Sequence, residues 1–328
     1  MVFLCVLVLI FYILTKLVIP KTSYTKIIKE FYKEPKDSLD VVFVGDSSIY
    51  KGVSPMQLWH EHGIASYNYA SPTQRVWDSY YCVKEVLNYQ KPKVIVMDTN
   101  QIFREDPTTP EYQRHLYDNV KMGKPKLEGI SNKIQGNDMK KVFSYIFPIT
   151  RFHSRWSELK DNDFALYEGE YPYVFKGYMV VNKTKPFIQK NKNKRKGNDV
   201  IGENVLFYLE EIKKETDKNN VKFVLISVPN PKTWNDNRRN QITQWANMHN
   251  VEFIDLNGTS KINIDWNQDT EDEGTHLNWK GAKKNTYYLG NHLVTKYKLT
   301  NHKKEEQYKD WLECEKKYEE YIRKINNQ

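Results

Sequence analysis

The sequence has few cysteines, no glycine-rich phosphate loop and no histidines at a metal-binding spacing. Its 328 residues include three cysteines, Cys5, Cys82 and Cys314, which argues against a disulfide scaffold. Among the eight histidines, His60 and His62 are two residues apart and cannot share one face of a helix. We therefore expect neither a metal site nor a cofactor.

Charge is abundant but is spread along the chain. Lys and Arg number 50 against 41 Asp and Glu, a net charge of +9, and the mean hydropathy is -0.74. The basic residues lie on lysine-rich polar stretches, so we expect no nucleic-acid partner. One basic run is expected to be a solvated loop, although it could attract an anionic polymer or phospholipid headgroups. This run contains Lys190, Lys192, Lys194, Arg195 and Lys196.

A long apolar run occurs at the N-terminus, where residues 2–20 are interrupted only by Lys16. At about 1.5 Å per residue, a helix over this run would just cross a bilayer core of about 30 Å. We therefore expect a single transmembrane anchor. A cleavable signal peptide is one alternative, although no small-residue cleavage site and no preceding basic residue support it. A buried core helix is another.

Strand and helix patterns alternate along most of the chain. Apolar runs predict five strands, at residues 39–44, 64–69, 93–99, 221–228 and 251–256. Helices are predicted at residues 55–61, 74–89, 203–219, 234–249, 279–297 and 303–325. Parallel pairing requires crossover connections, so this alternation predicts a doubly wound, flavodoxin-like α/β fold whose five-stranded parallel sheet is covered on both faces.

The expected domain organisation has four parts. They are an anchor at residues 1–20, a linker at 21–38, the α/β domain at 39–300 and a charged helix at 301–328. Residues 103–200 break the alternation, and we expect an insertion over the carboxyl edge of the sheet, a possible substrate lid. In it, His153, Arg155 and Trp156 are candidates for binding an acyl group or a sugar. The alternative for these three is a structural role, with an arginine ion pair in a buried helix.

Two short segments carry the chemistry. Ser47 follows an apolar run and Gly45, which allows a sharp turn where the chain leaves a buried strand. Open α/β sheets bind ligands at this end of their strands. A serine becomes a nucleophile when an adjacent base takes its proton, and His276, between the last strand and the last sheet-packing helix, is the candidate base. Taken alone, each segment also fits an ordinary turn or helix cap.

A carboxylate is needed to fix the tautomer of such a histidine. Glu273 lies three residues before His276 and can fold back within one turn to accept the ring N–H. Asp272 is one residue further back and could serve instead. Both residues therefore remain candidates.

At these segments the chain resembles the SGNH (GDSL-type) hydrolase superfamily, whose first sequence block contains Gly-Asp-Ser and whose last contains Asp-x-x-His. It is more closely similar to the membrane-anchored members found beside membrane-bound O-acyltransferases in Gram-positive bacteria. It is distantly similar to the teichoic-acid D-alanylation protein DltD and to alginate acetylation proteins. The resemblance covers roughly residues 38–102 and 200–295, with a further segment at 147–156. It implies Ser47 as nucleophile and His276 as base.

The resemblance also implies an oxyanion hole built from a glycine amide and an asparagine side chain. Asn100 falls at the end of a predicted strand, where that asparagine is expected. Residues 68–74 occupy the place of the glycine block but contain no glycine. The N–H of Thr73 is the candidate donor, since an oxyanion hole needs an amide rather than a residue type. A second departure is Glu273, where the family has aspartate.

The function implied is acyl transfer through an acyl-serine, acting on O-acyl groups, expected to be acetyl, of an envelope polysaccharide or teichoic-type polymer. A membrane-bound O-acyltransferase is the expected partner. An esterase of the same substrates and a non-catalytic accessory protein are the alternatives. The resemblance places the catalytic domain outside the cell. Five lysines after the apolar run oppose this by the positive-inside rule, but whole domains can translocate despite flanking charge. They are Lys21, Lys26, Lys29, Lys33 and Lys36.

Overall fold

The computed structural model describes residues 1–133, 138–164, 174–188, 199–257 and 262–327. Its centre is a five-stranded parallel sheet in the order β2-β1-β3-β4-β5. The strands are β1 (Val41–Gly45), β2 (Ser66–Ala70), β3 (Val94–Asp98), β4 (Lys222–Ser227) and β5 (Glu252–Asp255). The predicted α/β fold with a five-stranded parallel sheet is confirmed, and each strand lies within two residues of its expected bounds.

Both faces of the sheet are buried, which explains the continuous apolar runs of its central strands. Val42 and Val44 pack into one hydrophobic cluster, whereas Val41 and Phe43 pack into another. Successive side chains of a strand point to opposite faces, so β1 contributes to both clusters. Val44 of β1 pairs in register with Met97 of β3. The residues that follow the two strands therefore lie side by side at the carboxyl edge of the sheet.

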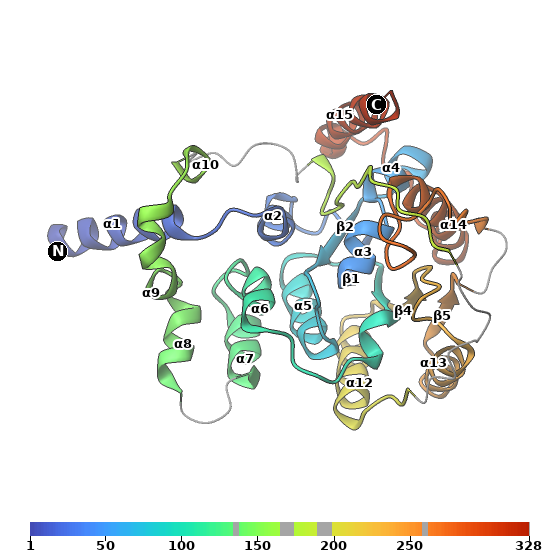
Figure 1. The fold of residues 1–328 in the computed structure, drawn as a ribbon, viewed down its shortest axis with the longest axis horizontal. Helices are drawn as coiled ribbons and strands as arrows, with labels where there is room; N and C mark the ends of the chain where they lie inside the picture. The colour runs from blue at the N-terminus through green and yellow to red at the C-terminus, as the bar shows by residue number, and fades with distance from the viewer. Residues whose placement is uncertain (134–137, 165–173, 189–198, 258–261, 328) are drawn as a thin grey trace.

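Helices cover the two faces (Figure 1). The first cluster includes residues of α5 (Val76–Tyr89), α12 (Glu203–Lys218) and α13 (Asp236–Met248). The second includes residues of α3 (Ser47–Gly52) and α14 (Trp279–Tyr297). Alongside α14 lies α4 (Pro55–His62), against which η5 (Glu306–Tyr308) and α15 (Lys309–Asn326) pack through Trp59. The charged C-terminal helix therefore packs on the α/β domain.

The stretch expected to be a linker is folded. It forms α2 (Ser23–Glu30) and η1 (Phe31–Lys33), and Ile27, Ile28 and Phe31 are buried. Phe31 contacts the ring of Tyr67 in β2. The prediction of a linker was wrong because α2 buries Ile27 and Ile28 against the domain, while Lys26 and Lys29 of the same helix remain partly exposed.

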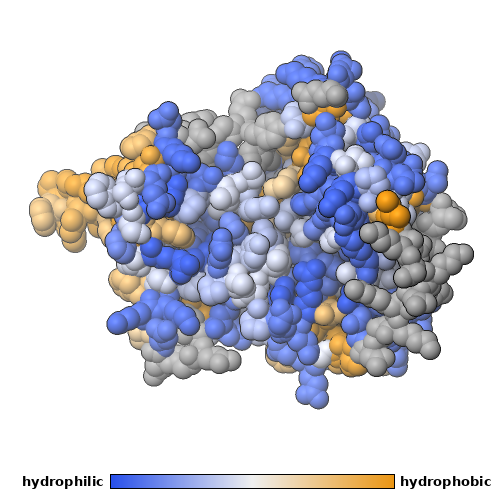
Figure 2. Space-filling view, in the orientation of Figure 1, coloured by the Kyte–Doolittle hydropathy of each residue, from blue (hydrophilic) through white to orange (hydrophobic). Residues whose placement is uncertain are grey.

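At the N-terminus, α1 (Val2–Val18) projects from the rest of the molecule, and Figure 2 shows apolar surface at that end. Within the described residues, none of the helices combines the length and apolarity needed to cross a membrane. The expected transmembrane anchor is therefore not found. The helix has 17 residues, about 26 Å at the usual rise, against a bilayer core of about 30 Å.

The described part of the insertion consists of short helices and of an extended segment at residues 179–187. After η2 (Thr99–Phe103), it contains α6 (Pro110–Tyr117), α7 (Lys124–Lys133), α8 (Met139–Ile146), α9 (Ile149–Phe152), η3 (His153–Glu158) and α10 (Asp161–Phe164). The helices α6 and α7 pack beside α2 and α5, while α9, η3 and α10 lie against α1 (Figure 1). Residues 179–187 instead follow the loop before α14, and the Lys185 N–H donates to the carbonyl of Thr270.

Candidate active site

Ser47 is the first residue of α3, directly after β1. Asp46 caps this helix, because its Oδ1 accepts the N–H of Ser48 at 2.9 Å. A Cβ on Gly45 would lie 2.8 Å from Cγ1 of Ile49, so a larger residue would clash with the new helix. The tight turn from strand to helix therefore presents Ser47 at the carboxyl edge of the sheet.

The loop between β5 and α14 brings His276 to this serine. Its Nε2 lies 2.7 Å from Ser47 Oγ, and its Nδ1 lies 2.6 Å from Asp272 Oδ2. Asp272 Oδ1 accepts the backbone N–H groups of Thr275 at 3.1 Å and His276 at 2.8 Å. A carboxylate on Nδ1 selects the tautomer whose Nε2 can accept a proton. Two segments separated by 229 residues thus form a serine–histidine–aspartate arrangement.

The electrostatics of Asp272 fit this arrangement. Burial alone would raise the pKa of its carboxyl, but the hydrogen bonds and charge of His276, together with the charge of Lys51, bring that pKa below its usual value. Asp272 is therefore held as the carboxylate. In this form it accepts the Nδ1–H of His276 and holds the ring in place.

Glu273 does not take the position expected for it. Its φ is 63°, which turns the side chain away from His276 toward Lys185 at 2.8 Å and Lys232 at 3.6 Å. The pKa of Glu273 is lowered, chiefly by its hydrogen bond with Lys185. The expectation for Glu273 is thus corrected: the tight turn places the fourth residue before the histidine, not the third, on its ring.

A second carboxylate near the histidine was missed by sequence reasoning. Glu271 Oε1 lies 3.7 Å from His276 Nδ1 and forms an ion pair with Lys51 of α3. The Glu271 side chain is 9% exposed and that of Lys51 is 15% exposed, so water screens this pair weakly. The pair joins the helix of Ser47 to the loop of His276. The sequence did indicate that Lys51 lies near the site, because it is one helical turn after Ser47.

Asn100 lies beside the turn that carries Ser47. Its Nδ2 is 2.9 Å from Asp46 Oδ2 and 3.3 Å from Ser48 Oγ. Arg104 Nη1 lies 3.2 Å from the same Asp46 oxygen. Asp46 therefore caps α3 and also holds the Asn100 amide at the site.

Asp98, the last residue of β3, is a buried carboxyl that was not singled out from the sequence. Burial and the neighbouring charge of Asp46 raise its pKa to about 8. Its Oδ2 accepts the N–H of Asn100 at 2.9 Å, and its Oδ1 accepts that of Val228 at 3.3 Å. Asp98 thus fixes the backbone that carries Asn100.

Thr73 lies in the turn after β2, and the N–H of Ser71 ties this turn to the carbonyl of Gly45. The φ of Thr73 is 53°, and its carbonyl accepts a hydrogen bond from Arg75 at 2.7 Å. Its N–H donates to no other residue that the structure describes. This amide is therefore available to a ligand.

The three candidates in the insertion are not brought to Ser47. Arg155 donates to the carbonyl of Val18 and to both carboxylate oxygens of Asp163, each at 2.9 Å. The ion pair of the alternative is therefore present, but the buried helix is not, because η3 has no buried residue. His153 begins the same 3-10 helix, and Trp156 is 72% exposed. The contacts of Arg155 join η3 to α1 and α10. The basic run lies outside the described residues, namely Lys190, Lys192, Lys194, Arg195 and Lys196.

Two groups of side chains in the described ranges have the composition of a metal site. One is Glu271, Asp272 and His276, whose ligand atoms are engaged with Lys51, Ser47 and one another. The other is His60, Glu315 and Glu319 on the surface of α4 and α15. Internal hydrogen bonds and ion pairs account for the first group, so the chemistry of the site is derived from its side chains alone.

In sequence, no protein-family model and no curated protein matches the chain. Sixteen chains of solved structures match it in fold. One of these is a candidate acylhydrolase from Bacteroides fragilis NCTC 9343, with 10% sequence identity and a TM-score of 0.38. The match covers 80% of this chain and 91% of that one. A similarity of this degree carries no argument about function, so the assignment of function rests on the site.

Proposed function

We propose that the protein is a serine acyl-transfer enzyme with Ser47 as nucleophile. The observation that carries the proposal is the contact of Ser47 Oγ with His276 Nε2 at 2.7 Å, with Asp272 on the other ring nitrogen. As Oγ attacks the acyl carbonyl, His276 takes its proton and Asp272 stabilises the imidazolium. The bond from the carbonyl carbon to the leaving oxygen then breaks, and His276 gives its proton to that oxygen.

The oxyanion in this proposal is held by the Asn100 side chain and by backbone N–H groups of Ser47 and Thr73. The Asn100 amide nitrogen carries two hydrogens, one toward Asp46 at 2.9 Å and one toward Ser48 at 3.3 Å. The longer of the two hydrogen bonds is the weaker, so we assign that hydrogen to the oxyanion. Asp46 keeps the amide in place through the other.

The proposed substrates are O-acyl groups, expected to be acetyl, on an envelope polysaccharide or teichoic-type polymer. The Gly-Asp-Ser and Asp-x-x-x-His segments that meet at the site support this through their resemblance to enzymes of that chemistry. An extracytoplasmic location and a membrane-bound O-acyltransferase partner belong to the same proposal. The acyl-serine passes its acyl group to a sugar hydroxyl when the site binds the acceptor and excludes water, and to water otherwise.

The test compares wild type with Ser47→Ala, using a chromogenic acetyl ester in vitro and the acetyl content of the envelope in cells. Ser38→Ala is the matched control, because Ser38 lies before β1, at the opposite end of the strand, and its hydroxyl donates to Pro35. Loss of ester turnover and of envelope acetylation in Ser47→Ala alone supports a transferase. Loss of turnover with excess acetylation supports an esterase. Equal behaviour of all three proteins contradicts the proposal and supports an accessory role.

A further inference from the structure

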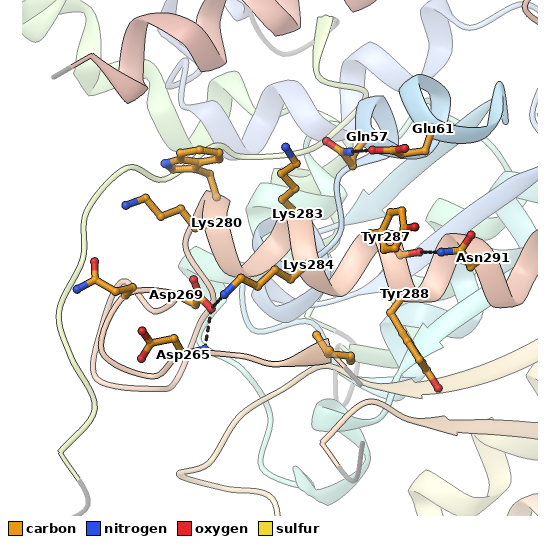
Figure 3. A pocket seen from close by; sticks show the side chains of 13 residues that line it. Gln57, Glu61, Asp265, Asp269, Lys280, Lys283, Lys284, Tyr287, Tyr288 and Asn291 are labelled. Atoms are coloured by element: carbon orange, nitrogen blue, oxygen red, sulfur yellow. Dashed lines mark hydrogen bonds and ion pairs between the residues drawn. The ribbon is translucent and has the colours of Figure 1, made fainter. Parts of the chain in front are cut away.

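A cavity of about 670 Å³ lies on the outer side of α14 (Figure 3). It extends from α4, with Gln57 and Glu61, to residues 262–269 on the other side of the helix. Ser47, Asp272 and His276 do not line it. Its volume lies within the range of ligand sites, about 300–1,000 Å³.

Aromatic rings form part of this cavity. Tyr287 is 53% exposed, Tyr288 is partly exposed, and Trp279, which also lines the cavity, is 8% exposed. The indole N–H of Trp279 donates to Asn182, which fixes the ring. Such rings combine apolar area with a polar tip, so they suit a ligand that has apolar patches among hydroxyl groups.

Of the three acidic side chains that line the cavity, Asp265 is exposed and accepts the N–H of Asn267 at 2.9 Å, whereas Asp269 and Glu61 are engaged with other side chains. Asp269 is 1% exposed, and its Oδ2 accepts from Lys284 at 2.6 Å and from the N–H of Asp265 at 2.7 Å. Glu61 accepts from Gln57 at 2.6 Å. These contacts leave little acceptor capacity for a ligand in Asp269.

Two lysines that line the cavity differ from these acidic residues in their side-chain contacts. Lys280 and Lys283 are exposed, and the side-chain amine of neither forms a hydrogen bond or an ion pair with any other residue in the described ranges. In Figure 3, Lys283 points toward α4, whereas Lys284 points toward Asp269. The cavity therefore combines two cations that lack a partner with aromatic rings and amide groups. This combination favours an anionic ligand.

The cavity adjoins the loop that carries the base. Asn278 caps α14 by accepting the N–H groups of Lys280 at 3.0 Å and Gly281 at 3.2 Å, and it lies two residues after His276. The same loop contributes Asp269 to the cavity and Asp272 to the catalytic arrangement.

We propose that this cavity binds a segment of an anionic, hydroxyl-rich polymer, away from the serine. The inference rests on the proposed function, since it makes this polymer the acyl acceptor or the acylated substrate. The negative groups face Lys280 and Lys283, and the apolar faces of the repeating unit pack on the tyrosines. Two polymers share this chemistry: a saccharide with carboxylate groups, and a polyol linked by phosphates.

The test measures binding of four probes to the full chain by isothermal titration calorimetry. The two anionic probes are an oligogalacturonate and a glycerol-phosphate oligomer. The two comparison probes are methyl-esterified oligogalacturonate and a single-stranded oligonucleotide of equal charge. We expect at least one anionic probe to bind, which identifies the source of the anion, and both comparison probes to bind more weakly.

The variant Lys280→Gln/Lys283→Gln should weaken binding by about fivefold, the effect of two partly exposed charge contacts. Lys218→Gln/Lys222→Gln makes the same charge change on an exposed surface by α12 and β4, and should bind as wild type does. Equal binding by the two double variants overturns the inference. So does binding of neither anionic probe, or equal binding of the oligonucleotide.

The Ser47→Ala variant separates the two proposals, because it should bind the anionic probe with unchanged affinity. If Ser47 proves unreactive while the two lysines still govern binding, the proposed catalysis fails and the polymer site stands. If Ser47 is reactive while the lysines have no effect on binding, the polymer site fails and the catalysis stands. The double variant should also turn over a small acetyl ester at the rate of wild type.

Discussion

Replacing Asp272 by Asn tests which carboxylate acts on the histidine. The variant keeps the shape of the side chain but removes the charge that lies 2.6 Å from His276 Nδ1. An asparagine can also present its NH₂ group to Nδ1 and so favour the tautomer whose proton faces Ser47. Both changes should lower kcat/KM for an acetyl ester.

The size of the effect follows from the exposure of Asp272. At contact distance, a pair of unit charges is worth about 4 kcal/mol near a protein surface and about 1 kcal/mol in bulk water. The Asp272 side chain is 37% exposed, so about 2–4 kcal/mol is expected. This corresponds to a loss of about 30- to 1,000-fold in kcat/KM.

The matched control is Glu273→Gln, which removes a charge from the adjacent residue. Its side chain is 47% exposed and forms ion pairs with Lys185 and Lys232, not with His276. We expect a change in kcat/KM of less than about twofold, because exposed ion pairs contribute little. Steady-state kinetics on the three proteins decide the matter. A larger loss in Glu273→Gln than in Asp272→Asn would refute the assignment.

Three further predictions follow from the contacts around the site. Lys51→Met removes the ion pair that joins the helix of Ser47 to the loop of His276, so kcat/KM should fall by about tenfold, whereas Lys51→Arg should keep it near wild type; an unchanged kcat/KM in Lys51→Met contradicts this role. Asn100→Ala should lower kcat by about 10²- to 10³-fold with little change in KM, and a change confined to KM would refute its part in the oxyanion hole. The pKa of Asp98 rises from 3.8 to about 8 on folding, so the folded state binds a proton that the unfolded state has lost, and its contribution to stability should fall as pH rises from 4 to 8. Urea unfolding of Asp98→Asn should show a shallower fall over this range, and an unchanged pH dependence would contradict the raised pKa.

The sheet could be predicted from the sequence because its signals are local. Each strand is a short apolar run, and crossover helices between the runs require parallel pairing. Ser47 and His276 could be selected for the same reason, since each follows a strand of that sheet. That the two side chains meet is decided by the loop between β5 and α14, which carries His276 to the edge of the sheet at Ser47.

The details that could not be predicted depend on turns and on distant pairing. Sequence spacing favoured Glu273 over Asp272, but a positive φ at Glu273 reverses the choice. The ion pair of Lys51 with Glu271 joins residues separated by 220 positions; the helical spacing of Lys51 from Ser47 places the lysine near the site but does not identify its partner. The folded linker was hidden by lysines that dominate the composition of residues 21–38, although Phe31 is fully buried.

The most direct test of the nucleophile is labelling with a fluorophosphonate, followed by mass spectrometry of the peptides. Wild type should carry the adduct on Ser47, Ser47→Ala should carry none, and His276→Ala should react at least about 100-fold more slowly because it lacks the base. Folded wild-type protein that stays unlabelled, or equal labelling of the Ser47→Ala variant, would contradict the account.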